Sequence, residues 1–162
     1  MTAEPQAAPP RTSSPDEVGW WQTAALGASI VIAAVVGVWS YALPQEFFDH
    51  FPSVLGEWVS QDGPYNEHLV RDHGAMYLAL GAASVAGVVW RTRVGFRLLG
   101  VAWTVFGILH FAYHVTHLGH MSTSDAVAQT VVLGVAVVLG VLLLIPPRPH
   151  VSSVRQSAGR TS

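Results

Sequence analysis

The stretch "AALGASIVIAAVVGVWSYAL", residues 24–43, decides the fold, because it contains no charged side chain. A helix crosses the ~30 Å hydrocarbon core of a bilayer with about 20 mostly apolar residues. The stretch therefore predicts a transmembrane helix. Its apolar run is too long for a cleaved signal peptide, and acidic rather than basic residues dominate the segment before it. We therefore expect the span to remain in the protein.

The composition of the whole chain agrees with a membrane protein. Of its 162 residues, 51% are hydrophobic and 11% are charged, whereas a soluble domain usually carries about 25% charged residues. The chain has no cysteine, which excludes disulfides and thiolate metal sites. The net charge of −2, without a basic stripe, argues against a nucleic-acid partner.

Three more segments, about 69–90, 94–116 and 126–145, are long and apolar enough to span a bilayer. The sequence thus predicts an all-α, four-transmembrane-helix bundle over residues 20–146. Glycines recur in the spans, and small residues allow membrane helices to approach closely. After Pro44, the aromatic residues Phe47, Phe48 and Phe51 predict a short helix that lies on the membrane or caps the bundle. We expect the tails, 1–19 and 147–162, to be disordered.

Arginine placement predicts the orientation of the spans, because basic residues favour cytoplasmic loops. Three arginines cluster between the second and third spans, and the remainder, apart from Arg71, lie in the two tails. Both termini are therefore expected in the cytoplasm. The outer side then receives most acidic residues, namely Glu46, Asp49, Glu57, Asp62, Glu67, Asp72 and Asp125.

The same topology gathers seven of the eight histidines on the outer side: His50, His68, His73, His110, His114, His117 and His120. Four of them lie in "HFAYHVTHLGH", residues 110–120, at the end of the third span. With about 100° per residue, His110, His114 and His117 fall within about 60° of one another. Because polar groups facing lipid are costly, we expect these side chains to turn inward.

The start of the second span faces this histidine segment in the predicted topology. His68 and Asp72 are spaced i, i+4, as are Glu67 and Arg71, which we expect to form an ion pair. His73 lies on a different side of that helix. Its depth is similar to that of His110: His73 lies roughly 6 Å inside the start of the second span, and His110 lies roughly 9 Å inside the end of the third. Asp125 and Gln129, at the start of the fourth span, are placed to join these polar side chains in one pocket at the outer side.

The leading hypothesis is a transition-metal site, because imidazole and carboxylate groups bind zinc, copper and iron. The predicted ligands are His68, Asp72, His110, His114 and His117, with Glu67, His73 and Arg71 as secondary candidates. An open coordination position would allow redox or hydrolytic chemistry. "HFAYH" lacks the glutamate of H-E-x-x-H, so a zinc protease of that type is not expected.

Three alternatives remain open at this stage. A b-type haem could take His68 or His73 from one helix and His110 or His114 from the other. A proton-linked network is the second, since histidine titrates near neutral pH. The third is a non-catalytic accessory or scaffold subunit in which the polar cluster only holds the bundle together. In each case the expected partners are the lipid bilayer and either further copies of the chain or a larger membrane complex.

In size and span layout, residues 20–146 resemble the small four-helix bacterial membrane proteins called DoxX-like, and actinobacterial membrane proteins of similar length. The resemblance concerns the arrangement of spans and rests on no diagnostic motif. It implies a four-helix bundle in the bacterial cytoplasmic membrane and assigns no functional residue.

Overall fold

The computed structural model describes residues 18–147, and all regular secondary structure within them is helical. Four long helices, each apolar and long enough to cross a membrane, confirm the predicted all-α, four-span architecture. They are α1 (Trp20–Ala42), α3 (Glu67–Trp90), α4 (Arg93–Val115) and α5 (Thr123–Leu144). Three short elements lie between them: α2 (Pro44–His50) and the 3₁₀ turns η1 (Ser60–Asp62) and η2 (Leu118–His120). The predicted disordered tails fall almost entirely outside the described residues.

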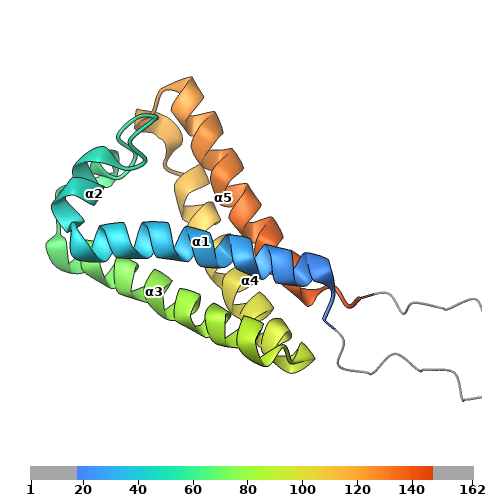
Figure 1. The fold of residues 1–162 in the computed structure, drawn as a ribbon. Coiled ribbons are helices and arrows are strands. Elements are labelled where there is room, and N and C mark those ends of the chain that lie inside the picture. The colour runs from blue at the N-terminus through green and yellow to red at the C-terminus, as the bar shows by residue number, and fades with distance from the viewer. Residues whose placement is uncertain (1–17, 148–162) are drawn as a thin grey trace, which may run out of the picture.

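The four long helices form two pairs. Helix α1 packs along α3 and α4 packs along α5, whereas contacts between the pairs are fewer. Figure 1 shows the pairs meeting where α1 begins and α5 ends, and diverging toward the opposite end. We call the end where the pairs meet the terminal end. The end where they diverge is the loop end, and it carries α2 and residues 51–66 and 116–122.

Glycines bring the paired helices into close contact, as their frequency in the spans predicts. A Cβ atom at Gly74 of α3 would lie 2.6 Å from the Ser40 hydroxyl and 2.7 Å from the Tyr41 nitrogen on α1. A Cβ atom at Gly140 of α5 would lie 2.8 Å from the Thr104 backbone nitrogen on α4. Small residues at these positions allow van der Waals packing between helices that lipid alone would not drive together.

The buried core lies toward the terminal end, where the two pairs meet. Leu26, Phe96 and Leu143 are fully buried there. The amide of Gln22 on α1 donates to the carbonyl oxygens of Leu143 and Ile145 at 3.0 Å each. The last carbonyls of a helix lack intrahelical partners, so this side chain completes the end of α5 and joins it to α1.

At the loop end, α2 caps the α1–α3 pair, which confirms the short helix expected after Pro44. The Phe47 side chain is buried and contacts the rings of Trp39 and Phe51, with centroids 5.8 and 4.6 Å away. Phe48 does not join this group, because its ring packs against Tyr65 at 5.2 Å.

Residues 51–66 bridge the two helix pairs at the loop end. The carboxylate of Asp125 on α5 accepts hydrogen bonds from the Gly56 backbone nitrogen at 2.9 Å and from the Trp58 indole at 3.3 Å. The Ser122 hydroxyl donates to the other carboxylate oxygen of Asp125 at 2.6 Å. Asp125 was predicted to join the histidine pocket; the structure instead uses its carboxylate to hold this bridge.

Candidate functional site

Three histidines turn inward between the helix pairs near the loop end. They are His73 on α3 and His110 and His114 on α4, and each is partly buried. The ring centroids of His73 and His110 are 5.9 Å apart, and those of His110 and His114 are 4.6 Å apart. The expectation that His73 and His110 lie at matching depths is therefore confirmed. We call these three residues the inner histidines.

Aromatic rings surround the inner histidines. Phe106 stacks on His110 with centroids 5.2 Å apart and planes 20° from parallel. The rings of Tyr77 and Phe47 lie 4.9 and 5.9 Å from that of His73. Polar groups in such surroundings cost free energy unless they find a partner, so the cluster favours a ligand or a water molecule that its nitrogens can bind.

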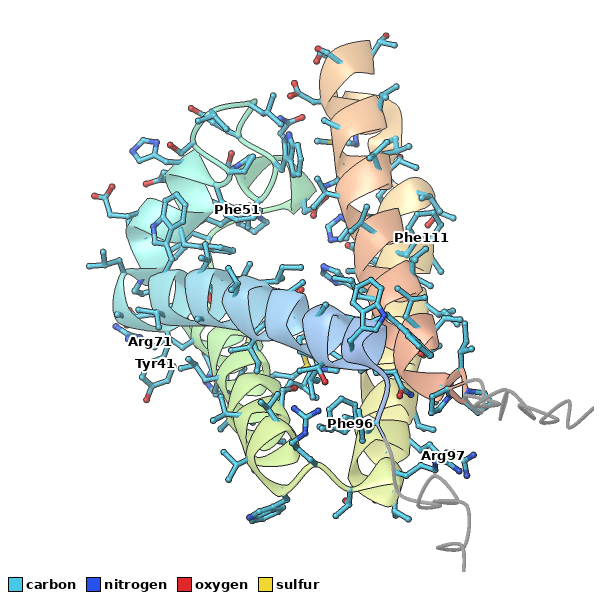
Figure 2. All side chains as sticks on the ribbon, turned by 45° about the vertical axis from the view of Figure 1, so that its right-hand side comes forward. Tyr41, Phe51, Arg71, Phe96, Arg97 and Phe111 are labelled. Atoms are coloured by element: carbon cyan, nitrogen blue, oxygen red, sulfur yellow. The ribbon has the colours of Figure 1, made fainter. Side chains whose placement is uncertain are left out.

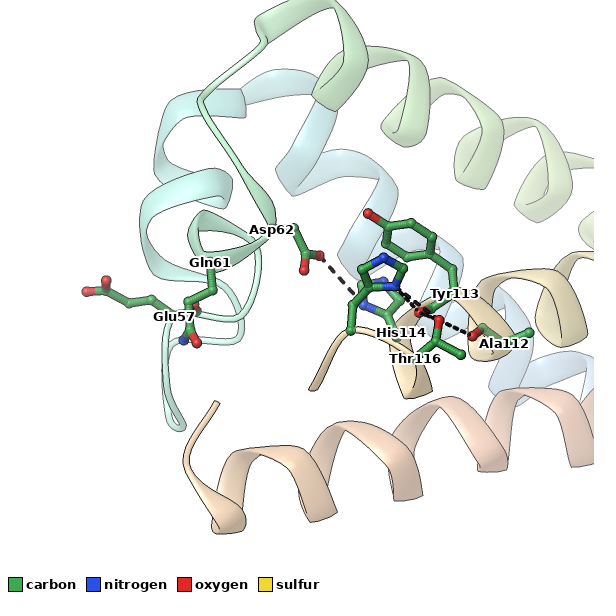
Figure 3. Close-up of polar contacts among 8 residues, drawn as sticks. Glu57, Gln61, Asp62, Ala112, Tyr113, His114 and Thr116 are labelled. Carbon is green, nitrogen blue, oxygen red and sulfur yellow. Dashed lines mark hydrogen bonds and ion pairs between the residues drawn. The ribbon is translucent and has the colours of Figure 1, made fainter. Parts of the chain in front are cut away.

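One carboxylate reaches the inner histidines from the bridging segment. The Asp62 Oδ2 atom in η1 lies 3.6 Å from His114 Nδ1, an ion-pair distance when His114 is protonated. Figure 3 shows the Asp62 side chain directed at the His114 ring. The exposed fractions of these side chains are 30% for Asp62 and 16% for His114, so this contact connects the solvent-facing segment to the cluster.

Two of the predicted ligands lie elsewhere on α3. His68 Nε2 and Asp72 Oδ2 are 3.3 Å apart, and their side chains are 87% and 63% exposed. Asp72 directly precedes His73, and one residue turns a helix by about 100°. When His73 faces the bundle, the His68–Asp72 pair therefore cannot. The predicted ion pair of Glu67 and Arg71 is confirmed, with 2.7 Å between Oε1 and Nε.

A third predicted ligand, His117, lies beyond the end of α4. The helix ends at Val115, where the Thr116 hydroxyl contacts the carbonyl oxygens of Ala112 and Tyr113 at 3.1 and 2.8 Å. The His117 ring stacks on Tyr113 with centroids 4.3 Å apart and is exposed. The prediction that His117 shares a helix face with His110 and His114 assumed that the helix continues through residue 117. The helix ends before it, so the prediction was wrong for His117.

The structure thus does not bring the five predicted ligands together. His110 and His114 turn inward, while His68, Asp72 and His117 remain exposed. Over residues 18–147, no group of three or more histidine, aspartate or glutamate side chains is already arranged to hold a metal ion.

Sequence reasoning underrated His73 and missed Asp62. A signal for His73 was present, since it follows Val70 by three residues and precedes Tyr77 by four, and both are buried. Residues at these spacings share a helix face. No comparable signal existed for Asp62, because the path of the bridging segment alone determines what its carboxylate contacts.

No protein-family model matches the sequence, and neither a curated protein nor a solved structure matches it. The resemblance to DoxX-like proteins therefore stays a prediction from the span layout.

Proposed function

We propose that this multi-pass membrane protein binds a divalent transition-metal ion at its loop end. The inner histidines supply three nitrogen ligands, and Asp62 supplies a carboxylate that can bind and leave. The observation that carries the proposal is a row of three imidazole rings from two helices inside the bundle, in which His110 lies next to both His73 and His114.

The ring separations suit ligands of one ion. Metal–nitrogen bonds of about 2.0–2.1 Å place an imidazole centre about 3.2 Å from the metal, so two imidazoles on a tetrahedral ion have centres about 5 Å apart. The observed 5.9 Å and 4.6 Å lie on either side of this value. We propose that rotation of the side chains directs the nitrogens of the three rings to one metal ion.

The donor set also limits the metal and its chemistry. Three imidazoles suit zinc, copper and iron, and one carboxylate offsets part of the charge of a divalent ion. Three histidines with an exchangeable fourth ligand are typical of sites where the metal activates water. Asp62 is the exchangeable group, because it comes from the bridging segment rather than from a membrane helix.

Metal analysis of the full-length protein tests the proposal. The purified, chelator-treated protein should take up one Zn²⁺, and Co²⁺ should give the visible absorption of a tetrahedral site. His73→Ala, His110→Ala and His114→Ala should each abolish uptake, whereas the exposed controls His68→Ala and His117→Ala should retain it. Absence of stoichiometric Zn²⁺ and Co²⁺ in the unaltered protein, or equal loss in the controls, would overturn the proposal.

A proton-linked network is the second candidate, and the Asp62–His114 contact favours it. That contact continues through His114 and His110 to His73, from the bridging segment into the bundle. Protein that binds no metal, but whose protonation-dependent tryptophan emission is lost in both Asp62→Asn and His114→Ala, would favour this function. Loss of stability alone in the same variants would indicate a scaffold role.

We also propose that the terminal end lies in the cytoplasm of a bacterial cell and that the metal site lies at the outer surface of the membrane. Arg91, Arg93 and Arg97 lie at the terminal end, where the turn joins α3 to α4. The acidic residues of the described part lie at the loop end. Basic residues are concentrated on the cytoplasmic side of membrane proteins.

A further inference from the structure

A second site, separate from the inner histidines, lies where α1, α2 and α3 meet at the loop end. It is a pocket of about 380 Å³ lined by Ala42, Leu43, Pro44, Gln45, Glu46, Tyr65, Glu67 and Arg71. Figure 2 shows Arg71 and Tyr41 side by side at this corner. Four membrane-spanning helices place their ends at the bilayer surface, so this pocket lies at the depth of lipid headgroups.

Arg71 is held in place within this pocket. Its Nε atom donates to Glu67, its Nη1 atom donates to the backbone oxygen of Tyr41, and its guanidinium lies 5.8 Å from the centroid of the Tyr41 ring. These contacts fix the planar guanidinium, and its side chain remains 40% exposed. A fixed guanidinium with further N–H groups is suited to bind a phosphate oxygen.

The charges around Arg71 restrict the ligand further. Two carboxylates, Glu46 and Glu67, line the same pocket, and Glu67 already pairs with Arg71. Glu46 has only a distant partner, His50, at 3.7 Å, and its side chain is 63% exposed. One guanidinium and two carboxylates repel a ligand of net negative charge. They suit a ligand that carries both a phosphate and an ammonium group.

A shallow, open apolar groove continues from this pocket along one face of α1. It has a volume of about 490 Å³, is lined by Ala34, Val35, Val38, Trp39, Ala42 and Leu43, and shares its last two residues with the polar pocket. Residues 34 to 43 span roughly 14 Å of helix. That length is close to half of the ~30 Å hydrocarbon core, and a lipid acyl chain occupies one such half.

We propose that the polar pocket and the groove together bind one phospholipid with a primary-amine headgroup, of the phosphatidylethanolamine class. The phosphate binds the free N–H groups of Arg71, the ammonium group donates to Glu46, and an acyl chain lies along the groove. The inference depends on charge complementarity at this corner and does not depend on the metal site.

Native mass spectrometry of the full-length protein, titrated with lipids of identical acyl chains, tests this. Phosphatidylethanolamine should bind roughly tenfold more tightly than phosphatidylcholine, whose quaternary amine cannot donate a hydrogen bond, or phosphatidylglycerol. Glu46→Gln should remove the preference over phosphatidylcholine. Glu57→Gln, which changes an exposed acid outside the pocket, should keep it.

Arg71→Gln should weaken all three lipids, and Arg71→Lys, which keeps the charge but not the planar fork, should recover part of the binding. Equal binding of phosphatidylethanolamine and phosphatidylcholine to the unaltered protein would overturn the proposal, as would identical behaviour of Glu46→Gln and Glu57→Gln. Full displacement of the lipid by soluble phosphoethanolamine would also overturn it, because the groove would then contribute nothing.

Discussion

The imidazole rings of His73 on α3 and His110 on α4 lie 5.9 Å apart, so one histidine from each helix pair faces the other. Helices α3 and α4 contact each other far less than either contacts its own partner helix. A ligand bound by both histidines would therefore link the two pairs where they otherwise make few contacts.

Zn²⁺ should raise the thermal stability of the protein, because an ion bound by both histidines links the two helix pairs. Free ion at 100 times its dissociation constant stabilises a folded protein by about 2.7 kcal/mol. The melting temperature of the unaltered protein should rise with Zn²⁺ concentration, whereas that of His73→Ala should not. His68→Ala, exposed on the same helix, is the control, and a loss of the Zn²⁺ effect in it would contradict the assignment.

A buried hydrogen bond between α3 and α4 should contribute measurably to stability. The Trp103 indole donates to the Ser84 hydroxyl at 3.0 Å, and both side chains are buried. Ser84→Ala leaves the indole unpaired and should cost about 0.6 kcal/mol, the average for such bonds between membrane helices, and at most about 1.7 kcal/mol. Denaturation in mixed micelles measures the difference.

Ser29→Ala is the matched control for that variant. Ser29 is also buried, and its hydroxyl donates to the Ala25 carbonyl of its own helix at 3.0 Å. Its replacement breaks no contact between helices. A larger loss of stability in Ser29→Ala than in Ser84→Ala would show that the interhelical bond contributes little.

Gly140→Ala should force α4 and α5 apart. The added Cβ would lie 2.8 Å from the Thr104 nitrogen and 3.0 Å from the Trp103 carbonyl carbon, both backbone atoms that cannot move alone. We expect a loss of about 1–3 kcal/mol, as for other overpacked cores. At Gly27, nothing lies within 4 Å of an added Cβ, so Gly27→Ala should cause no loss of stability. Equal losses at the two positions would contradict the packing described.

Asp125→Ala should release the bridging segment from α5. Gly56 and Trp58 lose their common acceptor, and an unpaired donor that stays buried costs about 1–3 kcal/mol. The Gly56 amide should then exchange its hydrogen faster, and Asp62 should be less constrained beside His114. Asp49→Ala, which removes an exposed contact with Gln45, is the control, and unchanged exchange in Asp125→Ala would contradict the predicted role.

The absence of native cysteine makes the proposed orientation directly measurable. Val54→Cys places a thiol on the bridging segment, where the native side chain is 86% exposed, and Val94→Cys places one at the terminal end, where it is 66% exposed. A membrane-impermeant maleimide added to intact cells should label the first and not the second. The reverse pattern would place the metal site in the cytoplasm.

The sequence alone determined the four spans and the local ion pair of Glu67 and Arg71. Hydrophobic length is a property of consecutive residues, so each span could be predicted to within a few residues of its observed ends. The Glu67–Arg71 pair is equally local, because it depends only on helix geometry within one turn.

Only the tertiary structure decided which polar residues face one another. A span that is apolar on most sides gives little indication of its rotation about its own axis, and the packing of α1 against Gly74 turned His73 inward rather than His68 and Asp72. The path of residues 51–66 brought Asp62 to His114 and fixed Asp125 to Gly56. These contacts join residues distant in sequence, so they depend on how the helix pairs diverge and not on any spacing along the chain.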